Sequence, residues 1–271
     1  MTERSLDRLQ GKVAIVTGAS RGIGAAIAVR FAREGATVIA AARNTDDLAQ
    51  TATLGGGRIV TQPCDVQKAS DVQALINRAI DDYGALDVLV NNAGVAVQKL
   101  LVDTTEEDWD TTMDTNVKGT FWGLKFAIPV MRAGGSIINV GSVNSFIGEQ
   151  TSSAYVTSKG AVLLLTKNAA AETAHLGIRV NIVCPGSTET QMSRGYFEAA
   201  MGSAEAADRF TRTFAPLTGM IPTDDIASAA LFLASDESKS MTGSSMLVDG
   251  GLLASWDHVP PLEGAVPVDH T

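Results

Sequence analysis

The stretch VAIVTGASRGIG, residues 13–24, decides the fold. Its first five residues suit a buried strand, and the glycine-rich TGASRGIG at 17–24 opens a helical pattern near residues 23–34. Glycine at such a strand-to-helix turn allows a tight bend and a close approach of a ligand to the backbone. The helix N-terminus offers unpaired N–H groups and a positive dipole end, so it can bind a pyrophosphate without a lysine. Because the spacing differs from the G-x-G-x-x-G fingerprint of dinucleotide-binding turns, a plain structural turn stays open as an alternative.

Short β-branched runs recur along the rest of the chain. They stand at residues 37–41, 58–62, 86–90, 136–140 and 178–183, and SSMLVDGG at 244–251 makes the last of the series. Amphipathic segments lie between them, near residues 69–82, 106–132 and 153–175. This alternation predicts an α/β fold, a doubly wound parallel sheet of about seven strands with helices on both faces. Ligands bind such sheets at the carboxyl ends of the strands, where the unusual motifs of this chain lie.

The composition is that of one acidic globular domain. The chain has 271 residues, 45% of them hydrophobic and 19% charged, and no shift in composition marks a second domain. A formal net charge of -9 disfavours nucleic acid, an anionic membrane surface or an acidic protein as partner, and leaves a small molecule as the expected one. The N-terminal MTERSLDRLQGK lacks the apolar core of a signal peptide, and no apolar run is long enough to span a bilayer. We therefore expect a cytoplasmic protein.

The cysteines and histidines point to no metal site. Cys64 and Cys184 each stand at the end of a predicted strand and are expected to be reduced core residues. His175, His258 and His270 have no ligand spacing with one another or with the cysteines.

Both ends of the chain differ from the alternating pattern. Residues 1–10 are polar and are expected to form an N-terminal tail. Residues 254–271 contain three prolines and no clear period, which predicts a C-terminal extension. The catalytic domain is therefore expected to span residues 11–253.

The end of the second predicted strand bears on the kind of dinucleotide. An acid there would hold a ribose 2′-hydroxyl, whereas a basic residue accommodates a 2′-phosphate. Here the strand ends Ala41, Ala42, Arg43, Asn44, without a carboxylate. Arg43 and Arg21 of the glycine-rich turn could clamp a phosphate, although either arginine alone could be a solvated surface charge. The sequence therefore predicts NADP rather than NAD.

The stretch SSAYVTSKGA, residues 152–161, places Tyr155 and Lys159 four positions apart in a predicted helix. Side chains at this spacing share a face and can touch. An ammonium beside a phenol favours the phenolate and so lowers the pKa of the tyrosine. Taken alone, a tyrosine and a lysine at this spacing are more often a surface pair on an amphipathic helix, and motifs elsewhere in the chain decide between these interpretations.

Together with further motifs, these residues resemble the short-chain dehydrogenase/reductase family, in its ordinary non-extended subgroup. The resemblance covers residues 11–251 and rests on TGASRGIG at 17–24, CDV at 64–66, NNAG at 91–94, Asn116, Ser142, the Tyr155/Lys159 pair, RVNIVCPG at 179–186 and VDGG at 248–251. Ser142 also stands 13 positions ahead of Tyr155, as is usual in the family. The resemblance implies a single-domain Rossmann-like subunit that carries both a cofactor site and a substrate site.

The resemblance implies a catalytic set of Asn116, Ser142, Tyr155 and Lys159. Tyr155 would exchange a proton with the substrate oxygen, and Ser142 would hydrogen-bond that oxygen. Lys159, together with the positive nicotinamide ring, would lower the pKa of the tyrosine and would grip the nicotinamide ribose. An asparagine in the place of Asn116 holds a water that connects the lysine to solvent.

The same resemblance implies the cofactor contacts. Asp65 would bond the adenine amino group, Asn91 the adenosine ribose, and Thr190 the nicotinamide carboxamide. From the residues alone, Asp65 and Thr190 could instead cap helices, and Asn91 and Asn92 could simply stabilise a turn. The full set of predicted cofactor-binding residues is Gly18, Ser20, Arg21, Gly22, Ile23, Gly24, Arg43, Asp65, Val66, Asn92, Ala93, Gly94, Tyr155, Lys159, Pro185, Gly186, Thr188, Thr190 and Met192.

The substrate side of the site is expected between Ser142 and Tyr155 and in a lid near residues 188–215. The segment after Thr190 carries Met192, Tyr196, Phe197, Met201, Phe210 and Phe214, a spacing that also suits ordinary core. These residues favour an apolar substrate. The predicted substrate-binding residues are Ser142, Asn144, Gln150, Tyr155 and Tyr196.

The sequence thus predicts an oxidoreductase that transfers a hydride between NADP(H) and a mostly apolar carbonyl or secondary alcohol. A 3-oxoacyl-(acyl-carrier-protein) reductase ranks second, because AIPVMRAGGSI before the fifth strand offers only Arg132 as a basic docking residue. A dinucleotide-binding regulator without catalysis is the alternative from another class. The helices at 106–132 and 153–175 keep apolar residues on more than one side, and the family resemblance implies a homotetramer or homodimer.

Overall fold

The computed structural model describes residues 7–215 and 217–254, without the side chains of residues 192, 199, 200 and 214. Its strands form one parallel sheet in the order β3-β2-β1-β4-β5-β6-β7. The strands are β1 (Val13–Thr17), β2 (Thr37–Ala42), β3 (Ile59–Pro63), β4 (Val88–Asn91), β5 (Ser136–Val140), β6 (Arg179–Pro185) and β7 (Ser245–Val248). The doubly wound Rossmann-like fold is confirmed, and the strand order reverses between β1 and β4, where such folds bind ligands.

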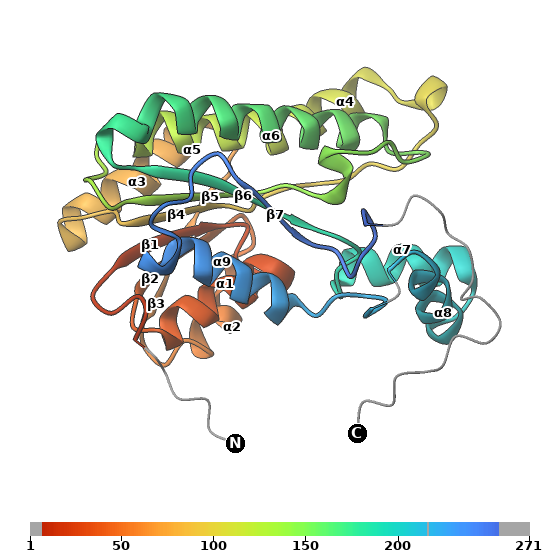
Figure 1. Ribbon diagram of the computed structural model, residues 1–271, viewed down its shortest axis with the longest axis horizontal. Helices are drawn as coiled ribbons and strands as arrows, with labels where there is room; N and C mark the ends of the chain where they lie inside the picture. The colour runs from red at the N-terminus through yellow and green to blue at the C-terminus, as the bar shows by residue number, and fades with distance from the viewer. Residues whose placement is uncertain (1–6, 216, 255–271) are drawn as a thin grey trace.

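Helices cover both faces of the sheet (Figure 1). One layer holds α3 (Ala69–Tyr83), α4 (Glu106–Met113), α5 (Gly119–Ala127) and α6 (Ser153–Thr173). The other holds α1 (Gly22–Arg33), α2 (Thr45–Thr53) and α9 (Thr223–Ala234). The sequence pattern did not predict α2 and α9.

The central strands bury both faces, which explains their continuous apolar runs. In β1, Ala14 and Val16 pack into the core on the side of α1 and α9, whereas Val13 and Ile15 pack on the side of α3 and α5. All five residues of β1 are buried. The first quoted stretch therefore lies at the centre of the sheet, with the glycine-rich turn at the carboxyl end of β1.

The helix expected over residues 106–132 is interrupted. After α4 the backbone forms a wide π-helical turn over Asp114–Lys118, continues as α5, and ends at Ala127, just before Pro129. Apolar periodicity does not distinguish a π turn from an α turn, so the sequence could not show the break. Such turns are frequent at functional sites, and this one contains Asn116.

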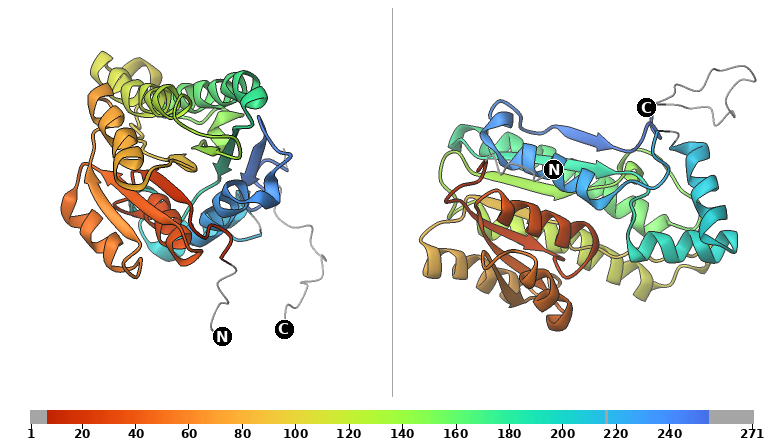
Figure 2. Two further views of the ribbon diagram at one scale, coloured as in Figure 1. Left: turned by 90° about the vertical axis from the view of Figure 1, so that its left-hand side faces the viewer. Right: turned by 90° about the horizontal axis from the view of Figure 1, so that it is seen from below.

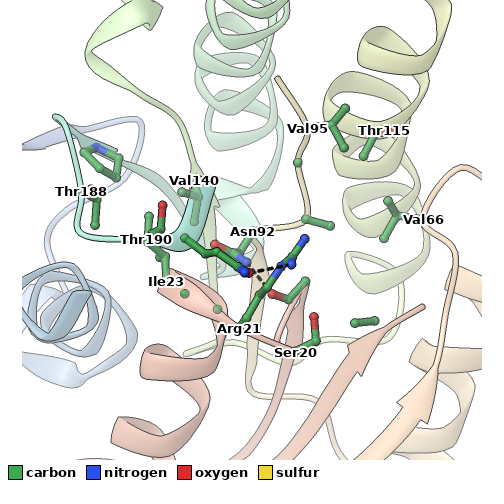
Figure 3. Close-up of a pocket in the computed structure, with 18 of the residues that line it drawn as sticks. Ser20, Arg21, Ile23, Val66, Asn92, Val95, Thr115, Val140, Thr188 and Thr190 are labelled. Atoms are coloured by element: carbon green, nitrogen blue, oxygen red, sulfur yellow. Dashed lines mark hydrogen bonds between the residues drawn. The ribbon is translucent and has the colours of Figure 1, made fainter. Parts of the chain in front are cut away.

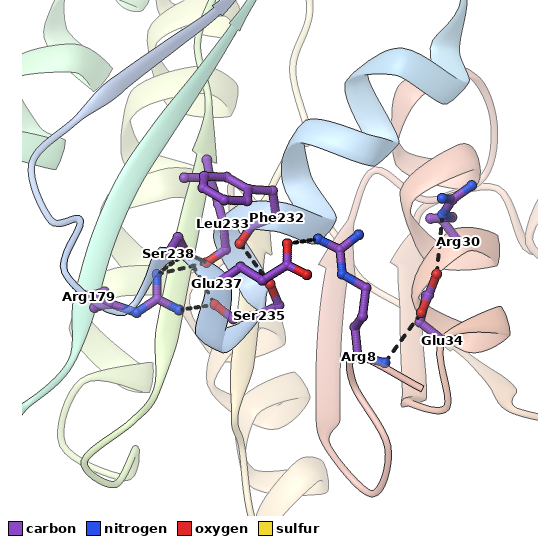
Figure 4. Close-up of polar contacts among 9 residues, drawn as sticks. All are labelled: Arg8, Arg30, Glu34, Arg179, Phe232, Leu233, Ser235, Glu237 and Ser238. Carbon is purple, nitrogen blue, oxygen red and sulfur yellow. Dashed lines mark hydrogen bonds and ion pairs between the residues drawn. The ribbon is translucent and has the colours of Figure 1, made fainter. Parts of the chain in front are cut away.

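The N-terminal end packs onto the domain earlier than residue 11. Leu9 is fully buried, and its N–H donates to the Glu34 carbonyl. The Arg8 guanidinium pairs with Glu237 beyond α9 (Figure 4). Only the part of the expected tail before residue 7, and the extension beyond residue 254, lie outside the described residues.

A buried arginine closes the end of α9. The Arg179 side chain donates to the carbonyl oxygens of Leu233 and Ser235, at 2.8 and 3.2 Å, and to Ser238 Oγ at 2.8 Å (Figure 4). Carbonyl groups at a helix C-terminus lack intrahelical partners, and a cation there also complements the helix dipole. Arg179 thus serves the packing of α9 against β6 rather than the chemistry at the other end of the sheet.

Two helices project from the carboxyl end of the sheet. They are α7 (Gln191–Met201) and α8 (Ala204–Phe214), which lie at the right in Figure 1 and in the right-hand view of Figure 2. Their small apolar cluster of Phe197, Ala207 and Met220 is separate from the main cores. The segment expected to be a lid is therefore a helical hairpin with its own packing.

Candidate active site

One cavity of about 400 Å³ runs along the carboxyl ends of the strands, from the end of β2 to the start of α7. Figure 3 shows Arg21 of the glycine-rich turn and Thr190 at the start of α7 on this cavity. It brings together all the predicted cofactor-binding residues except Met192, namely Gly18, Ser20, Arg21, Gly22, Ile23, Gly24, Arg43, Asp65, Val66, Asn92, Ala93, Gly94, Tyr155, Lys159, Pro185, Gly186, Thr188 and Thr190. The side chain of Met192 lies outside the described part of the structure.

The glycine-rich turn has no room for side chains at two positions. A Cβ on Gly18 would lie 2.8 Å from Ala93 Cα, and Gly18 has φ +65°. A Cβ on Gly24 would lie 2.3 Å from the Gly18 carbonyl oxygen. No side chain caps the N-terminus of α1, and no acid stands in its first turn. The unpaired N–H groups and the dipole of this helix therefore suit an anionic group such as a pyrophosphate.

The end of β2 carries a cation and, unexpectedly, a carboxylate nearby. Arg43 is exposed and lines the cavity, as do Asn44 and Asp47. Asn44 caps α2 and donates to Asp47 Oδ2 over 2.9 Å. Asp47 escaped the sequence analysis because it stands in a helix beyond the strand end rather than on it.

The phosphate clamp predicted that Arg21 would act together with Arg43. In the structure, the Arg21 side chain is bonded to the start of α7 instead. Its Nη1 donates to Gln191 Oε1 over 3.0 Å, and both side chains are exposed. The contact joins the glycine-rich turn to the first residue of α7. A Cβ on Gly22 would also meet Thr190 Cγ2 at 3.3 Å, so this turn and the start of the helical hairpin lie close together.

The three polar residues assigned to the adenosine half have different surroundings. Asp65 lines the cavity and accepts a hydrogen bond from the Gln67 N–H, which makes a local turn rather than a cap on α3. Asn92 lines it as well and donates to the carbonyl oxygens of Thr17 and Gly18. Asn91 does not: it is buried, donates to Asn139 Oδ1 over 2.9 Å, and packs under Gly123. The Asn91 side chain therefore belongs to the sheet interior, and the expected ribose contact of this residue stays a prediction that does not involve its amide.

The amide of Asn116 makes three hydrogen bonds inside the protein. Its Oδ1 accepts from the Val95 N–H at 2.8 Å, and its Nδ2 donates to the Val95 carbonyl and to Ser158 Oγ, both at 2.9 Å. The side chain is buried and does not line the cavity. Through these bonds the π-helical turn ties the loop after β4 to α6, one residue before Lys159.

Ser142, Tyr155 and Lys159 meet at the inner end of the cavity. Lys159 Nζ lies 5.5 Å from the centre of the Tyr155 ring and donates to the Val140 carbonyl over 2.8 Å. Ser142 lines the cavity together with Tyr155 and lowers the pKa of the phenol against the larger effect of burial. Its Oγ also donates to Asn144 Oδ1 at 3.0 Å and accepts from the Asn144 N–H at 3.1 Å. The serine, tyrosine and lysine are thus held in one constellation by β5 and α6.

The pKa values of this pair differ from the expectation. Burial raises the pKa of Tyr155, an effect that the hydrogen bond with Ser142 offsets in part and the charge of Glu149 increases. Burial lowers the pKa of Lys159 to about 8. The expectation that Lys159 lowers the pKa of Tyr155 is not met in this structure, because burial of the phenol dominates its pKa.

Two threonines stand where β6 leads into α7, and both line the cavity. Thr188 is buried, and its Oγ1 donates to the Gly186 carbonyl. Thr190 accepts from the Ser193 N–H with its Oγ1 at 3.2 Å and so caps α7. Capping and cavity lining, which the sequence offered as alternatives for Thr190, occur together.

Three of the predicted substrate-binding residues do not line this cavity. Asn144 is buried beside Ser142, and Gln150 is exposed on the loop before α6. Tyr196 is 37% exposed and contacts the Phe197 ring. In α7 and α8 the aromatic side chains pack on each other, since Phe197 also contacts Phe210. Their substrate roles stay predictions.

Several cavity residues escaped the sequence analysis. Gly141 and Val95 lie in the loops after β5 and β4, and Thr115 lies in the π-helical turn after α4; none of the three carries a charge or a motif of its own. Cys64 lines the cavity too, although its expected burial as a free thiol is confirmed, as is that of Cys184. Burial raises the pKa of Cys64 to about 12 and that of Cys184 to about 11.

Within residues 7–215 and 217–254 there is no cluster of three or more metal-ligating side chains. No helix in that part of the chain is long and apolar enough to cross a membrane.

Comparison with known proteins places this cavity in a family. The family model described as enoyl-(acyl carrier protein) reductase matches residues 18–253. The 3-oxoacyl-[acyl-carrier-protein] reductase of Thermotoga maritima is 39% identical over 251 residues, which cover 91% of this chain and 99% of that protein. The NADP-dependent (R)-specific alcohol dehydrogenase of Lentilactobacillus kefiri is also 39% identical, covering 92% and 99% of the two chains.

A solved structure agrees with these relatives. Levodione reductase superposes with a TM-score of 0.87 at 28% identity, covering 92% of this chain and all of that one. The sheet order, the glycine-rich turn and the matched family model concur. The chain belongs to the short-chain dehydrogenase/reductase family, in its ordinary non-extended subgroup of oxidoreductases that act on alcohol and ketone groups.

Proposed function

We propose that the protein is an NADP(H)-dependent reductase of neutral, mostly apolar ketones and dehydrogenase of the matching secondary alcohols. The observation that carries the proposal is the meeting of Ser142, Tyr155 and Lys159 at the inner end of the cavity that begins at the glycine-rich turn. A proton-exchanging group and a dinucleotide-shaped cavity in one place suit hydride transfer to a carbonyl.

The residues present fit a dinucleotide. The crowded glycines at 18 and 24 and the uncapped N-terminus of α1 suit the pyrophosphate, and Asp65 and Asn92 line the same cavity, where they would meet the adenosine half. When bound, the nicotinamide cofactor would supply or accept the hydride. Arg43 supports NADP over NAD, because its exposed guanidinium stands where a 2′-phosphate would lie and can bind it in bidentate fashion.

Tyr155 would carry the proton between solvent and the substrate oxygen. In reduction the phenol donates to the developing alkoxide, and in alcohol oxidation the phenolate accepts the hydroxyl proton. Ser142 would turn its hydroxyl from Asn144 toward the substrate oxygen and stabilise the charge that develops there. Lys159 would give its ammonium to the tyrosine and to the cofactor ribose, and Asn116 would act as a positioning residue that holds α6 against the loop after β4.

The proposal is tested with the purified protein by following nicotinamide absorbance. A panel of cyclic and aryl ketones, 3-oxoacyl thioesters and the matching alcohols is offered with NADPH/NADP and with NADH/NAD in parallel. Turnover of neutral ketones with NADPH supports the proposal. Absence of turnover throughout, with saturable NADPH binding, would favour the non-catalytic regulator instead.

A second candidate is reduction of 3-oxoacyl groups on acyl carrier protein. The 39% identity to the Thermotoga maritima protein of that name favours it. The scarcity of basic residues speaks against docking of an acidic carrier. A carrier-bound 3-oxoacyl substrate that exceeds free ketones in kcat/KM by a wide margin would reverse the order of the two candidates.

We also propose that the protein forms a homodimer or homotetramer. Trp109 on α4, Phe121 on α5 and Leu164 on α6 are 37%, 41% and 67% exposed on the helical layer of one face. Large apolar side chains gathered on one helical layer suit burial against a second copy. Light scattering of the purified protein distinguishes monomer, dimer and tetramer by mass. The cytoplasmic location stays a prediction from the sequence.

A further inference from the structure

Resting on the proposed function, we infer that Glu149 is a specificity-determining residue. Its carboxylate sets a fixed negative charge beside Ser142 and Tyr155, so that the site selects neutral carbonyl compounds over those that carry a carboxylate close to the carbonyl group.

A short chain of hydrogen bonds links Glu149 to the reacting groups. Asn144 donates from Nδ2 to Glu149 Oε2 over 3.0 Å. The same amide accepts from Ser142 Oγ with its Oδ1 over 3.0 Å, and the Asn144 N–H donates to Ser142 Oγ over 3.1 Å. Ser142 in turn acts on the Tyr155 phenol, whose pKa it lowers against the larger effect of burial. The carboxylate is thus two hydrogen bonds from the Ser142 hydroxyl.

The carboxylate also fixes which way the Asn144 amide points. A carboxylate can only accept hydrogen bonds, so the NH₂ group of the amide must face Glu149 and its oxygen must face Ser142. Asn144 is 8% exposed and Ser142 7%, whereas Glu149 is exposed. The negative charge is therefore held at the solvent-exposed end of a buried link to Ser142.

Within the described part of the chain, Glu149 forms no ion pair. Two cations on neighbouring segments pair with other acids, Lys99 with Asp108 and Arg194 with Glu189 and Glu198. Lys159 keeps its positive charge while it donates to the Val140 carbonyl, and it is the same in the wild type and in Glu149→Gln. The charge is felt at the reacting group, because Glu149 contributes, after burial, to the raised pKa of Tyr155. An anionic group brought beside Glu149 would be repelled by this carboxylate.

The expected size of the discrimination follows from Coulomb's law. At a separation of about 8 Å and an effective dielectric constant of about 40, two like charges repel by an energy that corresponds to roughly fivefold in an equilibrium constant. Salt screens such a charge, because the Debye length falls from about 10 Å at 0.1 M to about 3 Å at 1 M. A selectivity that arises from Glu149 must therefore weaken as salt is added.

The test compares matched neutral and anionic ketones. Methyl 4-acetylbenzoate is paired with 4-acetylbenzoate, and ethyl 3-oxobutanoate with 3-oxobutanoate, and kcat/KM is measured with NADPH at 0.05 and 0.5 M NaCl. The wild type is compared with Glu149→Gln, which keeps the shape and removes the charge. Glu172→Gln, at the far end of α6, is the matched control, since Glu172 is exposed and accepts a hydrogen bond from Asn168.

We expect the preference for the neutral ketone to fall about three- to tenfold in Glu149→Gln, through a lower KM for the anionic partner, and to keep its wild-type value in Glu172→Gln. The wild-type preference should shrink at 0.5 M NaCl, whereas that of Glu149→Gln should change little. An unchanged preference in Glu149→Gln, with wild-type turnover of the neutral ketones, overturns the inference and leaves the proposed function standing. No turnover of any ketone by the wild type overturns both.

Discussion

The ammonium group of Lys159 donates a hydrogen bond to the carbonyl oxygen of Val140 over 2.8 Å, at the buried point where α6 meets the end of β5. Burial lowers the pKa of this lysine from 10.5 to about 8. The protein thus holds Lys159 in surroundings whose burial disfavours the charged ammonium form. Groups used in catalysis are often held in such surroundings, at a cost to stability.

Replacing Lys159 by methionine should therefore stabilise the fold while abolishing turnover. The lowered pKa of Lys159 corresponds to a cost of about 3 kcal/mol for burying the ammonium, which the methionine removes. The variant also loses the hydrogen bond to Val140, which is worth about 1 kcal/mol. We expect Lys159→Met to raise the free energy of unfolding by about 1–3 kcal/mol at pH 7, as measured by urea denaturation.

The gain in the free energy of unfolding expected for Lys159→Met should depend on pH in one direction. The folded-state pKa of about 8 lies below the unfolded value of 10.5, so between these pH values the unfolded chain binds more protons and wild-type stability rises with pH. The advantage of Lys159→Met should be complete below pH 8 and should close toward pH 10.5. Lys167→Met, exposed on the same helix, is the control and should show no such gain. Equal destabilisation of Lys159→Met at every pH would contradict the argument.

Tyr155→Phe should remove most of the turnover and keep cofactor binding. The substitution deletes only the hydroxyl that exchanges the proton, a contribution of about 10²- to 10⁴-fold in rate. NADPH binding, followed by nicotinamide fluorescence, should stay within about twofold, because the ring still fills its place on α6. Tyr83→Phe, at the end of α3, is the matched control and should retain wild-type kcat/KM. Substantial residual turnover in Tyr155→Phe would remove the residue from the proposed role.

Arg43→Ala should lower the preference for NADPH over NADH. A charged hydrogen-bonding pair with a 2′-phosphate is worth about tenfold or more in kcat/KM, and NADH lacks that phosphate. Arg21→Ala should have a smaller effect on this ratio, because Arg21 donates to Gln191 rather than facing the end of β2. Arg132→Ala serves as control, since Arg132 lies at the opposite end of the strands and contacts the Gly84 carbonyl. A wild type that prefers NADH, or an unchanged ratio in Arg43→Ala, would refute the clamp.

The sheet and most of the cofactor cavity could be predicted from the sequence because they depend on local signals. The β-branched runs mark strands that are buried on both faces, and the glycine-rich turn and strand-end residues follow from them. The ribose contact predicted for Asn91 shows the limit of such signals. Asn91 adjoins Asn92 in the chain, but its side chain points into the sheet and donates to Asn139. Alternation along a strand puts neighbours on opposite faces, and the motif alone does not say which residue faces the ligand.

The links between distant segments could not be predicted. The Arg21–Gln191 bond, the use of the Asn116 amide by Val95 and Ser158, and the Asn144–Glu149 bond all depend on side-chain positions that only the folded chain defines. The π-helical turn at Asp114–Lys118 had no signal in the apolar spacing. The pKa of Tyr155 depended on burial, which outweighed the neighbouring charge that the sequence showed.

Gly24→Ala should distort the cofactor cavity, because the added methyl group has no room between α1 and the end of β1. The new methyl group would lie 2.3 Å from the Gly18 carbonyl oxygen and 2.4 Å from Asn92 Nδ2, so α1 must move away from the end of β1. We expect a loss of about 1–3 kcal/mol in the free energy of unfolding and a weakening of NADPH binding that exceeds tenfold.

The matched control is Gly195→Ala, in α7, where nothing lies within 4 Å of the added methyl group. Alanine is the better helix former by about 1 kcal/mol, so this variant should be neutral or slightly more stable and should bind NADPH as the wild type does. Urea denaturation and fluorescence titration of both variants separate the two effects. If Gly24→Ala bound NADPH with wild-type affinity, the close approach of α1 to Gly18 would not be needed for cofactor binding. That result would contradict the proposal that the pyrophosphate binds at the N-terminus of α1.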